Sequence, residues 1–173
     1  DASSVYGEGK RMAEVLCAVY HKHYNLPVKV ARCYAFIGPF LALDSHFAAG
    51  NFIKNIIKGE DIIIKGDGTP TRSYMYSADL MIWLWTILFK GKNNSPYNVG
   101  SDQSISIHKL AELVAKVNDS SVTQVIVKTP VSNKPIERYV PDTTKASKEL
   151  NLNVYLDIET SIKKTIEFNR TML

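Results

Sequence analysis

The sequence lacks several features that would place it in a specialised class of proteins. It has two cysteines, Cys17 and Cys33, among 173 residues, and their spacing fits no metal-binding motif. We therefore expect a reduced, cytoplasmic protein without disulfides and without a metal ion. No signal peptide is visible. The most apolar stretch, residues 80–89, is too short to span a bilayer, so we expect no membrane partner.

Long runs of one charge are also absent. The 21 Lys and Arg residues and the 17 Asp and Glu residues leave a formal net charge of +4, and the basic residues are scattered along the chain. A nucleic-acid partner is therefore not expected, whereas an anionic small ligand is compatible with the mild positive excess. With 45% hydrophobic and 22% charged residues, the composition is that of a globular domain.

A glycine-rich loop for a dinucleotide is missing as well. Neither G-x-G-x-x-G nor G-x-x-G-x-x-G occurs, and Gly7-Glu8-Gly9 lies at the start of a predicted helix rather than after a strand. The chain opens at Asp1, inside a motif and without a start methionine. We therefore expect a fragment or a processed form of a longer protein.

Predicted helices and short strands alternate along the chain. Apolar residues recur at three- and four-residue spacing between Met12 and Val19, which predicts a helix over residues 6–24. Ser77 and Ser106 are expected to cap two later helices. The alternation predicts an α/β fold. Further helices are expected at 47–58, 77–89, 107–117, 143–150 and 157–169, strands at 28–34, 62–64, 73–76, 97–100 and 122–128, and irregular structure at 129–141.

Tyr6 and Lys10 form the pair with the clearest chemical meaning. They are four residues apart on a predicted helix and so share one face. An ammonium group beside a phenol favours the phenolate, since the opposite charge stabilises the anion. Such a tyrosine can exchange a proton with a substrate hydroxyl. A tyrosine and a lysine at this spacing also occur on ordinary helix surfaces, so the pair alone leaves a structural role open.

Six segments of the chain match the motifs of one family in order. Through them the chain resembles the C-terminal portion of the extended short-chain dehydrogenase/reductases that act as NAD-dependent nucleotide-sugar epimerases and dehydratases. The segments are Tyr6-Gly7-Glu8-Gly9-Lys10-Arg11-Met12-Ala13-Glu14; residues 30–34 running to Gly38-Pro39; Asn51-Phe52-Ile53; residues 66–74 with Asp79-Leu80; Tyr97-Asn98-Val99-Gly100; and Arg138-Tyr139-Val140-Pro141-Asp142 with Lys145-Ala146.

The resemblance implies the C-terminal part of a Rossmann-type doubly wound domain joined to a small α/β substrate-binding domain. Residues 1–38 would be the remainder of the NAD-binding domain, and residues 39–173 mainly the nucleotide-sugar-binding domain. Residues 73–100 would return to the Rossmann sheet. Relatives commonly form homodimers through the helix that bears the tyrosine. Met12, Val15 and Val19 are therefore candidate dimer contacts, and a role in the core is equally open.

The resemblance also implies an enzyme, either an isomerase or a lyase. It would oxidise a sugar carbon, usually C4, with NAD as cofactor, and epimerisation, dehydration or decarboxylation would follow. Tyr6 matches the catalytic base, and Lys10 matches the lysine that supports it and holds the nicotinamide ribose, so both would also contact NAD. The residues that separate dehydratases from epimerases would lie before Asp1.

Three further residues match contacts to the nucleotide diphosphate. These are Asn51, Arg72 and Arg138, and two guanidinium groups could hold two phosphates. A surface ion pair for each arginine and a turn role for Asn51 remain open. Ala35 stands where many relatives carry a substrate-binding asparagine. His46 could touch the ligand or cap a loop, and Ser3 and Ser4 are expected to be helix-entry residues.

A second hypothesis belongs to another class of function. Because the dinucleotide-binding N-terminal half is not in the chain, the chain could be an isolated nucleotide-sugar-binding module without catalytic activity. The nucleotide base and the sugar are left open by the sequence.

Overall fold

The computed structural model describes residues 4–45, 47–117, 125–128 and 135–172. Ser3, His46, residues 122–124 of a predicted strand and residues 129–134 therefore lie outside the described residues. Within the described part, helices and short, mostly parallel strands alternate, and the predicted α/β class is confirmed.

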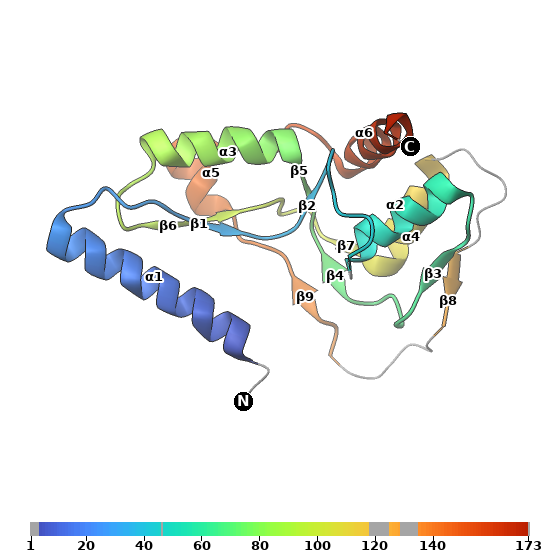
Figure 1. Cartoon of the computed structure of the whole chain (residues 1–173), viewed down its shortest axis with the longest axis horizontal. Coiled ribbons are helices and arrows are strands. Elements are labelled where there is room, and N and C mark those ends of the chain that lie inside the picture. The colour runs from blue at the N-terminus through green and yellow to red at the C-terminus, as the bar shows by residue number, and fades with distance from the viewer. Residues whose placement is uncertain (1–3, 46, 118–124, 129–134, 173) are drawn as a thin grey trace.

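One part of the fold is built on two neighbouring parallel strand pairs (Figure 1). β1 runs parallel to β6, and β2 runs parallel to β5. α3 and α5 lie on one side of the β1–β6 pair, and α1 lies on the other side. These elements are α1 (Val5–Tyr24), β1 (Val30–Cys33), β2 (Phe36–Ile37), β5 (Met75–Tyr76), α3 (Ser77–Lys90), β6 (Pro96–Val99) and α5 (Thr144–Leu150).

The other part holds three helices around a common apolar core (Figure 1). α2, α4 and α6 contact one another, and α2 and α4 also contact the parallel pair β3–β8. The buried side chains include Phe52 and Ile53 of α2, Leu110 of α4 and Ile162 of α6. The elements are α2 (Ala48–Lys58), β3 (Ile62–Ile64), α4 (Ile107–Val117), β8 (Val125–Val127) and α6 (Ile158–Thr171).

A small three-stranded sheet lies between the two parts (Figure 1). Its strands are β4 (Thr71–Arg72), β7 (Ile105–Ser106) and β9 (Arg138–Tyr139), in the order β7–β4–β9. β4 is antiparallel to β7 and parallel to β9. The segment 129–141 was expected to be irregular, and that expectation is wrong at β9. A strand of two residues has no periodicity that a sequence could reveal.

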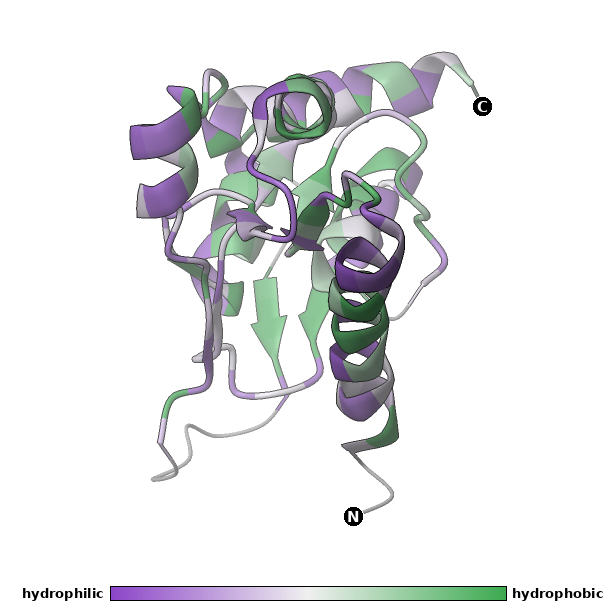
Figure 2. Ribbon diagram, turned by 90° about the vertical axis from the view of Figure 1, so that its left-hand side faces the viewer, coloured by the Kyte–Doolittle hydropathy of each residue, from purple (hydrophilic) through white to green (hydrophobic). Residues whose placement is uncertain are grey.

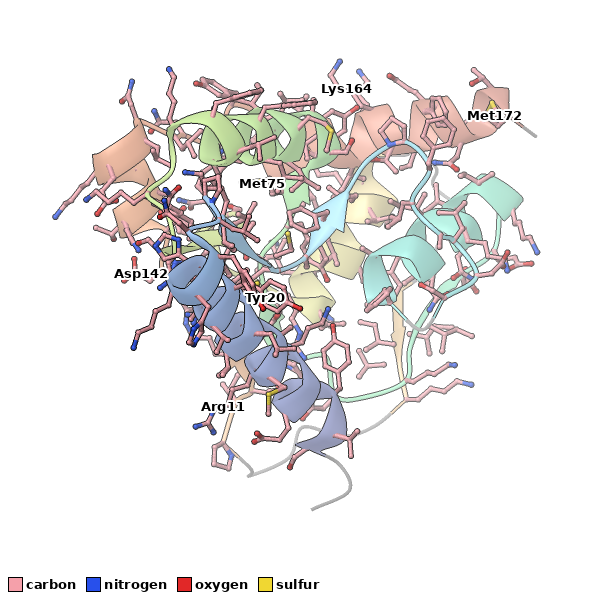
Figure 3. All side chains as sticks on the ribbon, turned by 60° about the vertical axis from the view of Figure 1, so that its left-hand side comes forward. Arg11, Tyr20, Met75, Asp142, Lys164 and Met172 are labelled. Carbon is pink, nitrogen blue, oxygen red and sulfur yellow. The ribbon has the colours of Figure 1, made fainter. Side chains whose placement is uncertain are left out.

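α1 stands apart from both apolar cores. None of its residues is buried, and Met12, Val15 and Val19 are 57%, 49% and 41% exposed. In Figure 2, apolar and polar residues mix along this helix, and Figure 3 shows Arg11 pointing away from the fold, whereas Met75 lies in the interior beneath α3. The core role left open for the three residues is therefore not taken up within this chain, and dimer contact stays a prediction.

The predicted helices are confirmed with end positions shifted by a few residues, but one capping expectation is wrong. Ser77 is the first residue of α3, and Tyr76 occupies the N-cap position without a side-chain cap. A Cβ atom on Gly38 would lie 2.2 Å from Ser77 Oγ, so that hydroxyl faces the end of β2. Ser106, by contrast, accepts a hydrogen bond of 3.1 Å from Lys109 N–H and caps α4 as predicted.

Among the strands, the parallel pairing joins residues 30–37 with residues 75–99. This is the stretch that was expected to return to the first sheet. The division of the chain into two domains at residue 38 stays a prediction.

Candidate functional site

Tyr6 and Lys10 lie on one face of α1, near its amino-terminal end. Lys10 Nζ is 5.4 Å from the centroid of the Tyr6 ring. The Tyr6 side chain is open to solvent, with 78% of its surface exposed. The helical spacing therefore brings an ammonium group to the face of an accessible phenol, as the sequence predicted.

The carboxyl end of β1 lies close to this pair. Burial raises the pKa of the Cys33 thiol, and the nearby Lys10 ammonium opposes part of that rise. Burial also raises the pKa of Tyr139, with smaller contributions from Tyr34 and Tyr6. These interactions place Tyr6 and Lys10 on the side of the fold where β1 and β9 end, although the two strands are far apart in the sequence.

Arg72 lies beside Tyr139. Its Cζ atom is 5.9 Å from the centroid of the Tyr139 ring, and its Nη2 atom is 2.8 Å from Glu137 Oε1. Arg72 Nη1 also donates to Thr71 O at 3.0 Å. The Arg72 side chain is 25% exposed, so part of the guanidinium group remains accessible to a ligand.

The Arg138 side chain leaves the small sheet on the face opposite to that of Arg72. The register of β4 and β9 pairs Thr71 with Arg138 and Arg72 with Tyr139. Because successive residues of a strand point to opposite faces, Arg138 does not share the face of Arg72 and Tyr139. Arg138 is exposed. Arg72 therefore shares its face of the small sheet with Tyr139, and the two arginines leave that sheet on opposite faces.

Asn51 lies in the first turn of α2, in the other part of the fold. Its backbone N–H donates to Phe47 O at 3.2 Å, and no described residue forms a hydrogen bond with its side-chain amide. The preceding loop packs closely here, since a Cβ atom on Gly50 would lie 2.6 Å from Ala42 O. None of the described contacts of Asn51 reaches Arg72.

Three other residues, Ser4, Ala35 and Trp83, lie at a helix start, in a loop and in the core. Ser4 stands at the N-cap of α1, is exposed and makes no capping hydrogen bond. Ala35 contributes its backbone oxygen, which accepts a hydrogen bond of 3.1 Å from Met75 N–H. Trp83 of α3 is buried, with 1% of its surface exposed.

Two residues of the site were missed from the sequence. Tyr34 and Tyr139 stack, with ring centroids 4.7 Å apart and an interplanar angle of 29°. Tyr139 was visible only as the neighbour of Arg138, and Tyr34 only as the end of a strand. No signal in the sequence could pair two tyrosines that are so far apart.

A cavity of about 860 Å³ lies away from this cluster. Its lining includes Tyr74, Ser101, Thr143, Ser147 and Tyr155, but not Tyr6, Lys10 or Arg72. Lysine and aspartate side chains both border it, so its charges largely balance. We place the candidate site at the tyrosine–lysine pair, because Tyr6, Lys10 and Arg72 do not line this cavity.

The described residues contain neither a candidate membrane span nor a candidate metal-binding cluster. No helix in residues 4–45, 47–117, 125–128 and 135–172 is long and apolar enough to cross a membrane. The same residues hold no group of three or more His, Cys, Asp or Glu placed to bind a metal ion. Cys17 and Cys33 are both free cysteines.

Comparison with known proteins gives consistent relatives. The chain is 32% identical to UDP-glucuronic acid decarboxylase 1 of Arabidopsis thaliana over 94% of its length, and 33% identical to UDP-glucuronic acid decarboxylase 5 of the same plant over 85%. These matches cover 37% and 42% of the two relatives. The chain thus spans about two fifths of the length of the curated relatives it matches.

Solved structures share the fold. The chain is 26% identical to the UDP-glucuronic acid 4-epimerase from Bacillus cereus, solved with UDP-glucuronic acid and NAD, with a TM-score of 0.81 over 97% of this chain and 53% of that one. It matches Pal from Bacillus thuringiensis at 27% identity and a TM-score of 0.84, with the same coverage. The architecture is therefore that of Rossmann-fold epimerases and dehydratases. Residues 1–100 also match the model of the NAD dependent epimerase/dehydratase family, and the chain belongs to that family.

Proposed function

We propose that the full-length protein is an NAD-dependent nucleotide-sugar epimerase or dehydratase that oxidises a sugar carbon, usually C4, before the second step. The observation that carries this proposal is the Tyr6–Lys10 pair, with the ammonium nitrogen 5.4 Å from the centroid of an exposed phenol ring. Family membership supports the reaction class.

The residues present fit the nicotinamide end of NAD. A phenol and an ammonium group on one open helix face can both donate hydrogen bonds to ribose hydroxyls. The glycine-rich loop that would hold the pyrophosphate is not in this sequence, so this chain would hold only part of the cofactor. NAD, when bound, supplies the acceptor for the hydride from the sugar carbon.

The protein's own residues handle the proton. Tyr6, as phenolate, takes the proton from the sugar hydroxyl while the hydride leaves the same carbon. Lys10 stabilises the phenolate through its positive charge and returns no proton itself. After the second step the same phenol can give its proton back to the sugar oxygen.

Charged groups would bind the substrate diphosphate. Arg72 presents a partly exposed guanidinium group near Tyr6, and guanidinium groups suit phosphate oxygens. We assign Asn51 and Arg138 as further contacts, with Arg138 the weaker because it starts from the other face of the small sheet. The decarboxylases among the relatives make UDP-glucuronic acid the first substrate to test.

We also propose that the protein forms a homodimer and works in the cytoplasm. The exposed apolar residues of α1, Met12, Val15 and Val19, are available for a homodimer contact. Two free cysteines fit a reducing compartment such as the cytoplasm.

The alternative is a nucleotide-sugar-binding module without turnover. It is favoured by one observation, the short span of this chain relative to its relatives. The two functions differ in whether NAD binds and whether product forms.

Calorimetry and turnover assays on the full-length protein test both. We expect one member of a panel of UDP- and dTDP-sugars to bind, and NAD to be required for turnover. Replacement of Tyr6 by Phe should lower kcat by roughly 10²- to 10⁴-fold while the nucleotide-sugar still binds. Tyr24→Phe, at an exposed tyrosine of the same helix, is the matched control and should leave kcat unchanged.

Two outcomes would count against the enzyme. Unchanged kcat in the Tyr6→Phe variant would remove Tyr6 from the mechanism. Nucleotide-sugar binding without NAD binding or product would favour the binding module.

A further inference from the structure

We propose that Tyr139 is a positioning residue, whose ring is braced by Tyr34 and aims the Arg72 guanidinium group at the diphosphate of the substrate. The inference rests on the proposed function, and it adds two tyrosines to the site. Tyr139 would add no charge to the site and would only orient the charged guanidinium group of Arg72.

The backbone sets Arg72 and Tyr139 side by side. β4 and β9 pair in parallel, with Arg72 opposite Tyr139. The two side chains therefore leave the sheet on the same face. Thr71 N–H also donates to Glu137 O at 2.8 Å, which extends the pairing by one residue. The distance of 5.9 Å between Arg72 Cζ and the Tyr139 ring centroid follows from this register and is within the range of a cation–π contact.

Tyr34 supports the Tyr139 ring by stacking against it. Tyr34 N–H donates to Val99 O at 3.0 Å, so its backbone continues the β1–β6 pair. A Cβ atom on Gly100 would lie 3.2 Å from Tyr34 Cβ, which shows how closely the chain packs at this point. Tyr139 is 46% exposed, and the stack at 4.7 Å is its described aromatic contact. The stack with Tyr34 thereby restricts the positions that the half-exposed Tyr139 ring can take.

The charge arrangement leaves Arg72 able to take a phosphate. A guanidinium group has five N–H donors, and the described acceptors of Arg72 are Thr71 O and Glu137 Oε1. Glu137 is 69% exposed, so a diphosphate can displace it at little cost. The Tyr139 ring can therefore orient the guanidinium group while donors without a described acceptor remain available to phosphate oxygens.

The cluster of Tyr34, Tyr139 and Arg72 also lies on the side of the fold that holds Tyr6. Tyr6 and Cys33 are both close enough to Tyr139 to influence its titration, and burial keeps its pKa above the ordinary value. Tyr139 is therefore neutral at neutral pH, and a neutral ring adds no repulsion towards a diphosphate anion.

The test is the affinity of the full-length protein for UDP, measured by calorimetry, together with kcat and KM. Tyr139→Leu should raise the Kd for UDP roughly three- to thirtyfold, the range of a cation–π contact. KM should rise more than kcat falls, because the lost interaction is with a part of the substrate that does not react. Tyr139→Phe keeps the ring and should stay within about twofold of the wild type.

Controls separate orientation from folding. Tyr155→Leu removes another tyrosine, 63% exposed and bordering the separate cavity, and should leave the Kd for UDP unchanged. A cycle of Tyr139→Leu with Arg72→Gln should show coupling, since Tyr139 acts through Arg72. If Tyr139→Leu does not fold, Tyr34→Leu removes the brace and should raise the Kd in the same direction.

The outcomes distinguish this inference from the function on which it rests. An unchanged Kd in both the Tyr139→Leu and Tyr34→Leu variants, with binding lost in Arg72→Gln, would overturn the positioning role and leave the proposed function standing. Additive effects in the cycle would also overturn it. A wild-type protein that binds no nucleotide or nucleotide-sugar would overturn the proposed function itself.

Discussion

The backbone N–H of Leu156 donates a hydrogen bond of 3.1 Å to the carboxylate of Asp79, 77 residues earlier in the chain. Tyr155 N–H donates to the same Oδ2 atom at 3.1 Å. Trp83 Nε1, one turn further along α3, donates to Asn153 O at 2.9 Å. These three bonds fasten the segment before α6 to α3, and so join the two parts of the fold.

Loss of the Asp79 carboxylate should therefore destabilise the whole chain. Asp79 is 1% exposed, and its removal leaves two backbone N–H groups without an acceptor. We expect Asp79→Ala to lower the free energy of unfolding by about 2–4 kcal/mol, as measured by urea titration. The control is Asp102→Ala, at an exposed carboxylate whose described partner is the adjacent Gln103, and it should change stability by less than about 0.5 kcal/mol. Equal effects of the two substitutions would contradict the fastening role.

Two glycines should respond to alanine in opposite directions. A Cβ atom on Gly38 would lie 2.2 Å from Ser77 Oγ and 2.7 Å from Ser77 Cβ, so Gly38→Ala must displace the start of α3. Gly9, inside α1, has nothing within 4 Å of such an atom. Thermal unfolding should show a lower Tm for Gly38→Ala, whereas Gly9→Ala should gain roughly 0.5–1 kcal/mol of helix stability. A rise in Tm for Gly38→Ala would show that the contact is not constraining.

The helices were predictable because their apolar residues repeat with the helical period. α2 and α4 present Phe52, Ile53, Leu110 and Val114 to one core, and that pattern is visible in the sequence. Asp157 was expected as the first residue of the last helix and is instead its N-cap, with Thr160 N–H donating to its carboxylate at 2.8 Å. Local rules were sufficient for the helices themselves, although the cap of α3 was placed one residue too late.

Contacts between distant segments were not predictable in the same way. The pairing of β4 with β9 depends on two-residue strands, which carry no periodic signal. Trp83 and Trp85 lie two positions apart on α3, yet Trp85 is 58% exposed while Trp83 is 1% exposed. Residues two positions apart on a helix are separated by about 200° around its axis, so these two tryptophans lie on different faces. The Tyr34–Tyr139 stack likewise joins two distant segments that no local pattern could pair.

Arg72 and Arg138 should contribute unequally to ligand affinity. Arg72 lies on the same face of the small sheet as Tyr139, whereas Arg138 leaves from the opposite face. In calorimetry of the full-length protein with UDP, Arg72→Gln should therefore raise the Kd by roughly tenfold or more, as expected for loss of a charge-assisted contact. Arg138→Gln should have a smaller effect. A larger effect of Arg138→Gln would mean that the diphosphate lies on the other face.

Salt gives an independent check on this comparison. Charge-mediated binding weakens as ionic strength rises. The dependence of the Kd on salt should therefore become shallower in Arg72→Gln than in Arg138→Gln. The same slope in both variants would argue against a dominant role for Arg72.

Tyr74 should make the fold sensitive to alkaline pH. Burial raises its pKa from 10.0 to about 12, and the Arg72 charge only partly opposes this shift. No described residue forms a hydrogen bond with its hydroxyl. Between pH 10 and pH 12 the unfolded chain loses this proton while the folded chain keeps it, so folding stability falls as pH rises through that window. A difference of two pKa units corresponds to roughly 2–3 kcal/mol, which is fully present below pH 10.

Urea titrations at pH 8, 9, 10 and 11 measure this effect. Wild-type stability should fall between pH 10 and pH 11, and Tyr74→Phe, which has no proton to lose, should show a clearly smaller fall. Tyr155→Phe, at a tyrosine that is 63% exposed, should retain the wild-type fall and serves as the control for tyrosines in general. Parallel curves for wild type and Tyr74→Phe would show that Tyr74 ionises as readily in the folded chain as in the unfolded one, and that its ring is not held away from water.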